Sequence, residues 1–177
     1  MSSEKASKNG AVQARTDFYT MVHKGIRQRL FEAVILAGTV DFQDAGAGAK
    51  IVSMLTILAR EVREHAGHEE TFIHPVLAEV MPDMAASLHA GHEEHDRALD
   101  EVERAFEVAA AQRTAASGHL AYRALARFVA MFLTHTEEEE AMQPLLWDRV
   151  SEERLAAVMA AFWRSRKPAQ APLVDHA

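Results

Sequence analysis

The strongest constraint on this chain is a His followed four residues later by a Glu, which occurs twice on apolar stripes. The pairs are His65 with Glu69 and His135 with Glu139. On an α-helix this spacing places both side chains on one face, one turn apart. The neighbours at steps of three and four are apolar in both stripes: Ile51, Leu55, Leu58, Val62, Phe72 and Val76 in the first, and Ala121, Leu125, Phe128, Phe132, Met142 and Leu146 in the second.

A buried acid at each stripe needs compensation. An ionised Glu in an apolar interior costs free energy unless it is paired or bound to a metal, and two at one level repel each other. A cation between them removes both costs. Because the chain has no cysteine, disulfides, iron–sulfur clusters and thiolate zinc sites are excluded. The two pairs therefore predict a buried metal site made of nitrogen and oxygen ligands.

The bulk properties narrow the class of protein. The 177 residues suit one domain with a sizeable core. A net charge of −7 with scattered Lys and Arg argues against nucleic-acid binding. The first residues lack the apolar stretch of a secretion signal, and no segment approaches the length of a membrane span. We therefore expect a soluble, cytoplasmic protein with no membrane partner.

The periodicity predicts an all-α fold, an up-down-up-down antiparallel four-helix bundle with a short additional C-terminal helix. We expect the long helices near residues 16–37, 47–78, 83–112 and 119–146. Pro75 and Pro144 should end or kink two of them, and Asp44 and Ser117 are candidate N-caps. The short helix opens at Ser151, and its apolar face consists of Leu155, Val158, Met159, Phe162 and Trp163.

These helices divide the chain into four parts. We expect a disordered arm over residues 1–14, the bundle over 15–148, a helix packed on the bundle over 149–166, and a loose tail over 167–177.

Antiparallel order brings ligand-type residues from all four long helices to one level. His23 and the His65 pair straddle the first loop about symmetrically. Counting from the third loop matches His135 to a position near residue 93, whereas counting from the second turn favours His95, so His92 and His95 stay open on this ground.

If both Glu bridge, two metals each receive two nitrogens and two carboxylate oxygens, which leaves room for a small diatomic or peroxide ligand. The donors suit iron or manganese, and zinc also fits.

The ordered set of His, His-x3-Glu, His and His-x3-Glu resembles the hemerythrin-like, or HHE cation-binding, domains over about residues 17–146. Segment 22–27 (VHKGIR) and a Pro shortly after each pair add to the resemblance. The resemblance implies a non-haem diiron centre with two iron ions, oxo- or hydroxo-bridged and joined by both Glu. It also favours His92 over His95. The predicted metal ligands are His23, His65, Glu69, His92, His135 and Glu139.

Two departures limit the roles that the resemblance implies. The third long helix carries His89, His92 and His95 in place of a His-x3-His pair, and the last carboxylate is Glu139 in place of Asp, so simple oxygen transport is not implied. The chain lacks the N-terminal Cys-containing region of the iron–sulfur repair members. Ferritin-like diiron oxygenases place Glu before His at i, i+3, the reverse of the order here.

Our leading functional hypothesis is a diiron protein that binds or reduces O2, nitric oxide or hydrogen peroxide for sensing, storage or detoxification. A peroxidase-type oxidoreductase activity belongs to this hypothesis. The alternative is an iron-responsive or iron-handling interaction module without catalysis, and the third reading is a metal-free interaction bundle. A homodimer is compatible with the sequence.

Several polar residues fall outside the predicted ligand set. His68, His74, His89 and His119 lie off the stripes, and we expect them to be exposed. Glu70 and Glu140, with the acids beside them, should form a solvated face that raises the negative potential; a supporting role for them stays open. Tyr19, one turn before His23, is either a core residue or a hydrogen-bond donor to a bridging or terminal oxygen.

Overall fold

The computed structural model describes residues 15–165, and every regular element among them is a helix. The long helices are α1 (Thr20–Thr39), α2 (Ala45–Phe72), α4 (Pro82–Gln112) and α5 (Ala115–Arg149). The short ones are α3 (His74–Val80) and α6 (Glu152–Ser165). The prediction of an all-α fold is confirmed for this part of the chain. The predicted arm, 1–14, and tail, 167–177, lie outside the described residues.

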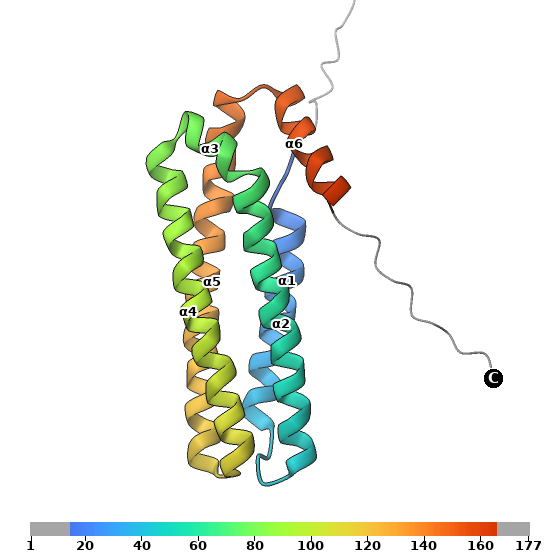
Figure 1. Ribbon diagram of the computed structural model, residues 1–177, viewed down its shortest axis with the longest axis vertical. Coiled ribbons are helices and arrows are strands. Elements are labelled where there is room, and N and C mark those ends of the chain that lie inside the picture. Colours follow the sequence, from blue (N-terminus) through green and yellow to red (C-terminus); the bar gives the residue numbers. More distant parts are fainter. Residues whose placement is uncertain (1–14, 166–177) are drawn as a thin grey trace, which may run out of the picture.

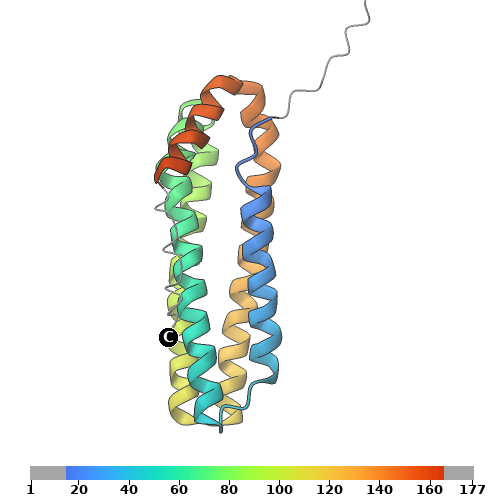
Figure 2. The ribbon, with the colours of Figure 1, turned by 90° about the vertical axis from the view of Figure 1, so that its right-hand side faces the viewer.

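The long helices lie side by side along one axis (Figure 1). The α1–α2 and α4–α5 connections are at one end of the molecule, whereas α3 and α6 are at the other (Figures 1 and 2). Helix α4 packs on α5 and α2, and α1 packs on the same two helices. Helix α6 turns back along the molecule and contacts α2. In residues 15–165, no helix has both the length and the apolar character needed to cross a membrane.

Side-chain caps set three of the helix starts. Asp44 caps α2 as predicted, accepting from the N–H groups of Gly46 and Ala47. The Ser117 prediction is wrong, because Thr114 Oγ1 accepts from the Ser117 N–H at 3.1 Å and α5 starts at Ala115. Helix α1 starts later than expected. The Asp17 carboxylate accepts from the N–H groups of residues 19 and 20, each at 3.0 Å, so Asp17 stays outside the helix as a cap.

The two prolines act differently. Pro75 ends α2 at Phe72 and lies in the first turn of α3, as predicted. Pro144 does not end its helix, because α5 continues through it to Arg149. The turn that follows Pro144 buries Leu146 and Val150 in an apolar cluster, and this burial outweighs one missing backbone hydrogen bond.

Two apolar clusters fill the interior, and a polar layer separates them. The first cluster lies toward the α1–α2 and α4–α5 loops and is centred on residues such as Leu30, Leu58, Phe106 and Phe128. The second lies toward α3 and α6 and includes Leu77, Leu88 and Leu155. Along each long helix the buried stripe passes from one cluster to the other through polar residues. These residues are His23 of α1, His65 and Glu69 of α2, His92 and His95 of α4, and His135 and Glu139 of α5.

Candidate metal centre

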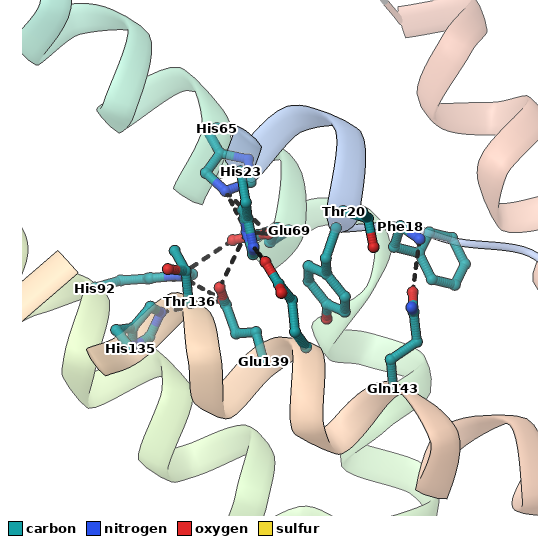
Figure 3. A network of polar contacts seen from close by, with 12 residues as sticks. Phe18, Thr20, His23, His65, Glu69, His92, His135, Thr136, Glu139 and Gln143 are labelled. Carbon is teal, nitrogen blue, oxygen red and sulfur yellow. Dashed lines mark hydrogen bonds and ion pairs between the residues drawn. The ribbon is translucent and has the colours of Figure 1, made fainter. Parts of the chain in front are cut away.

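The structure brings all six predicted ligands together in the polar layer. Figure 3 shows the side chains of His23, His65, His92 and His135 converging on Glu69 and Glu139. Every one of the six is buried, with exposed fractions from 0% to 9%. The helical period and antiparallel order are sufficient to place them at one level. Their role as ligands stays a prediction.

The two carboxylates are at the centre of the cluster. The His23 Nε2 atom lies 3.6 Å from Glu69 Oε1 and 3.3 Å from Glu139 Oε2. The His92 Nε2 atom lies 3.3 Å from Glu69 Oε2 and 3.4 Å from Glu139 Oε1. The remaining two imidazoles approach the Glu of their own helix, His65 at 3.2 Å and His135 at 3.1 Å. Each Glu is therefore surrounded by three ring nitrogens, an arrangement suited to bridging.

His92 and His95, which the sequence left open, occupy different surroundings. His92 faces both carboxylates, whereas His95 packs its ring 4.7 Å from that of His135 and 5.8 Å from that of Phe128. Burial, with the neighbouring imidazoles of His135 and His92, lowers the pKa of His95 to about 4. His95 is thus a neutral ring that supports His135 from behind.

His74 does not lie where the sequence predicted. It was expected to be exposed, but it is only 8% exposed and stacks on His92 with ring centroids 5.1 Å apart. The α2 stripe does not extend to it, because Pro75 breaks the helix and the start of α3 turns the side chain inward. His68 is half-buried, and His89 and His119 are exposed as expected.

Metal-ligand geometry is possible at two overlapping groups among the described residues. One consists of His23, His65, Glu69 and Glu139, and the other of His74, His92 and Glu139. In each, one donor atom per residue lies within 4.8 Å of the others. Since both contain Glu139, the arrangement fits two cations that share a carboxylate.

Glu70 and Glu140, predicted to form a solvated face, instead hold imidazoles of other helices. Glu140 Oε1 lies 2.9 Å from His23 Nδ1, and Glu70 Oε1 lies 3.2 Å from His92 Nδ1. Each acid accepts the Nδ1–H and so directs the Nε2 atom toward the central carboxylates. The available signal in the sequence was that each His-x3-Glu pair is followed at once by a second Glu.

Without metal, the buried imidazoles and carboxylates of the polar layer carry opposite charges that compensate each other. Burial alone would lower the pKa of His23, but the close contacts with the negatively charged Glu139 and Glu69 carboxylates outweigh it and raise the pKa to about 9. The same balance raises the pKa of His92 to about 10. Burial opposes ionisation of Glu139, yet the surrounding imidazoles, His135 first, hold its pKa well below the usual range. Protons on the imidazoles therefore compensate the carboxylates, and a cation would replace them.

Comparison with known proteins agrees with this geometry. The family model of the hemerythrin HHE cation-binding domain matches residues 15–146. The chain belongs to the hemerythrin family. Neither the curated proteins nor the solved structures compared with it gave a match. All six predicted ligands lie inside the hemerythrin match, and α6 lies after it.

The hemerythrin site contains buried polar atoms that the described residues leave without a hydrogen-bond partner. They include both carboxylate oxygens of Glu69, Oε2 of Glu139 and Nε2 of His74. Buried polar groups in proteins are normally paired, and these atoms are all donors of electron pairs to metals. Imidazole nitrogen and carboxylate oxygen without thiolate suit iron and manganese, and also zinc. The residues present therefore fit the metal that the family implies.

Two pockets reach the layer of this hemerythrin domain from opposite sides. One, of about 490 Å³, lies between α1, α2 and α6; its walls include Phe18 and Phe162, and it ends at His65 and Glu69. The other, of about 550 Å³, lies between α4 and α5 and reaches His135. The first pocket thus gives small ligands a route to the Glu69 carboxylate, whereas the second reaches the imidazoles of His95 and His135.

Proposed function

We propose that this hemerythrin domain is a non-haem diiron protein that binds or reduces a small oxidant, namely O2, nitric oxide or hydrogen peroxide. The observation that carries the proposal is the meeting of Glu69 and Glu139 in a buried layer, with unpartnered oxygens, among imidazoles from all four long helices. The finer topology that we propose is an up-down-up-down antiparallel bundle.

Each side chain has a role in this proposal. His23 and His65 would hold one ion, and His74 and His92 the other, with Glu139 shared and Glu69 beside it. His135 stays a predicted ligand next to Glu139. When bound, the iron pair supplies electrons and a coordination position for the ligand. Glu70 and Glu140 keep the imidazoles oriented, and the apolar clusters above and below exclude water.

The pocket under α6 supports a ligand that is small and uncharged. Its walls are largely apolar, and its charged lining is negative on balance, because Asp17, Glu61 and Glu64 outnumber Arg29, which pairs with Glu61 at 3.0 Å. Negative charge along an entrance repels anions and leaves neutral molecules unaffected. O2, nitric oxide and hydrogen peroxide are all neutral at pH 7, so the pocket suits this ligand class.

The alternative of an iron-responsive module, in which the metal orders the fold, is favoured less by the metal-free layer. Imidazoliums at His23 and His92 compensate the carboxylates without iron, because their raised pKa values keep them protonated at neutral pH. A bundle with compensated charges stays folded after chelation. Loss of helicity on adding a chelator, followed by circular dichroism, would support the module instead.

The proposal is tested by elemental analysis of anaerobically purified protein, followed by optical spectra on adding O2, peroxide or nitric oxide. We expect about two iron ions per chain, as in other dinuclear helical bundles, and a ligand-dependent spectrum. The double variant Glu69→Gln with Glu139→Gln should remain helical and lose the iron. Its control is Glu101→Gln with Glu137→Gln, which removes the same charge from exposed positions. Metal-free wild-type protein, or iron retained in the first variant, contradicts the proposal.

A further inference from the structure

Tyr19 is a buried phenol without a hydrogen-bond partner next to the metal layer. The residue immediately precedes α1, one turn before His23, and its side chain is 0% exposed. Its ring lies 5.3 Å from the His23 ring at an interplanar angle of 32°. The hydroxyl makes no hydrogen bond to any residue in the described part of the chain.

Packing alone does not account for this hydroxyl. The ring belongs to the second apolar cluster, whose other members are apolar side chains, so a phenylalanine would fill the same space. Leaving a buried O–H unpaired costs free energy that a phenylalanine avoids. The hydroxyl therefore needs a partner that residues 15–165 do not provide.

The surroundings of Tyr19 show where that partner lies. Burial raises the pKa of the Tyr19 hydroxyl well above its usual range, and the negative charges of Glu69 and Glu139 raise it further, so the neutral O–H form is favoured and the group remains a donor. Neither carboxylate accepts its hydrogen bond, although both have unpartnered oxygens. The Tyr19 ring packs on His23, whose Nε2 atom faces both carboxylates, so the unpaired hydroxyl and the unpaired oxygens lie near the same imidazole.

We propose that the Tyr19 hydroxyl donates a hydrogen bond to the small ligand held beside Glu69 and Glu139, and that it selects ligands that carry an acceptor atom. The inference rests on the proposed function, because it requires a metal-bound ligand at this place. Tyr19 then touches the ligand, and the charge-neutral phenol compensates negative charge on it without adding another cationic side chain to the layer.

The test compares Tyr19→Phe with Tyr122→Phe, the other tyrosine of the chain. Tyr122 is half-buried against the first apolar cluster and lines a pocket near the α1–α2 connection, far along the bundle from the layer. Each variant and the wild type are prepared metal-free and iron-loaded. Iron content, thermal unfolding and the dissociation constants of azide and nitric oxide are measured.

We expect Tyr19→Phe to keep its iron and to bind azide and nitric oxide about tenfold more weakly, the loss of one hydrogen bond. In the metal-free form its Tm should be unchanged or higher, because an unpaired hydroxyl has been removed. With iron and azide together its Tm should fall by about 2–4 °C relative to wild type. Tyr122→Phe should leave both dissociation constants unchanged.

Three results would overturn the inference. An equal fall in Tm with and without metal assigns Tyr19 a purely structural role. Loss of iron from Tyr19→Phe makes the phenol a metal ligand, not a donor to the bound molecule. Unchanged dissociation constants in an iron-loaded variant remove the hydrogen bond. If wild-type protein itself takes up no iron, the proposed function fails first, and the iron analysis shows this separately.

Discussion

The polar layer has an α1/α2 side and an α4/α5 side, and the two differ in how their imidazoles are arranged. On the α1/α2 side, His23 and His65 are the only imidazoles that reach the carboxylates among the described residues, and the pocket under α6 ends there. On the α4/α5 side several rings pack against one another, with centroids 4.7–5.1 Å apart, whereas the α1/α2 side has a single pair, His23 and His65, at 5.0 Å. The larger cluster contains His92, His95 and His135, with His74 of α3 stacked on His92. The contrast predicts that an ion on the α4/α5 side is held more rigidly and that ligand enters on the α1/α2 side.

The largest effect should come from Gly91 of α4, which lies against the His135 ring of α5. A Cβ atom on Gly91 would lie 2.4 Å from His135 Nδ1, so Gly91→Ala must move the ring. We expect the α4/α5 side to lose its metal and the iron content to fall by about half, with an affinity loss of about 100-fold or more. Metal analysis and titration measure this.

The matched control is Gly67→Ala, at an exposed position of α2 where a Cβ meets nothing within 4 Å. It should keep both ions and gain up to about 1 kcal/mol of helix stability. If Gly91→Ala binds iron like Gly67→Ala, the crowding of the α4/α5 side has no functional meaning.

A second large effect is the pH dependence of metal binding, and we expect it to be similar on the α1/α2 and α4/α5 sides. The pKa values of about 9 for His23 and about 10 for His92 mean that both rings are protonated at pH 7 without metal. Metal ligation needs neutral imidazole, so binding releases about two protons and the apparent affinity rises about 100-fold per pH unit near neutrality. A pH-indicator dye during metal titration counts the protons; release of none would contradict the assignment.

The same raised pKa values determine whether the metal-free protein gains or loses stability as pH rises. Since both pKa values are raised above the ordinary 6.5, their stabilisation is complete below that value and is lost as pH rises through about 9 and 10. Urea unfolding should therefore show the metal-free protein weakening from pH 7 to pH 10. Metal-loaded protein, whose ligating imidazoles are already neutral, should change less.

A smaller difference should separate Glu140→Gln from Glu70→Gln. Arg27 fixes Glu140 at 2.8 Å, whereas Glu70 is shared with the exposed His89 at 2.9 Å. Removing the better-ordered acceptor should weaken metal binding about 10–100-fold, and removing Glu70 should cost about tenfold. Competition with a chelator measures both, and equal losses would show that Arg27 adds no order.

The smallest effect should come from a substitution at the entrance of the pocket under α6. Gly25 lines the pocket under α6, and a Cβ there meets nothing within 4 Å. Gly25→Trp should fill the pocket and slow ligand association about tenfold, equivalent to about 1.4 kcal/mol in the barrier, with iron content unchanged. Stopped-flow mixing with nitric oxide measures the rate, and Gly67→Trp is the control. An unchanged rate would assign entry to the pocket that reaches His135.

The sequence was sufficient to predict which residues meet in the polar layer, but not which residues surround them. Helical spacing and loop positions place His23, His65 and His135 at one height, because a rigid helix carries its period over many turns. His74 was missed, since a break at Pro75 turns the chain in a direction that periodicity does not describe. Glu70 escaped for another reason, because its partner His92 lies on a different helix.

Helix α6 lines the route to the polar layer but contributes no predicted metal ligand. It follows the stretch that matches the family, yet Val158, Met159 and Phe162 form one wall of the passage to His65. Substitutions in this short segment can change which molecules arrive, and how fast, without altering any predicted metal ligand. Selectivity and metal retention are therefore free to evolve independently in this protein, and exchanging α6 alone would be a practical way to redesign the first while preserving the second.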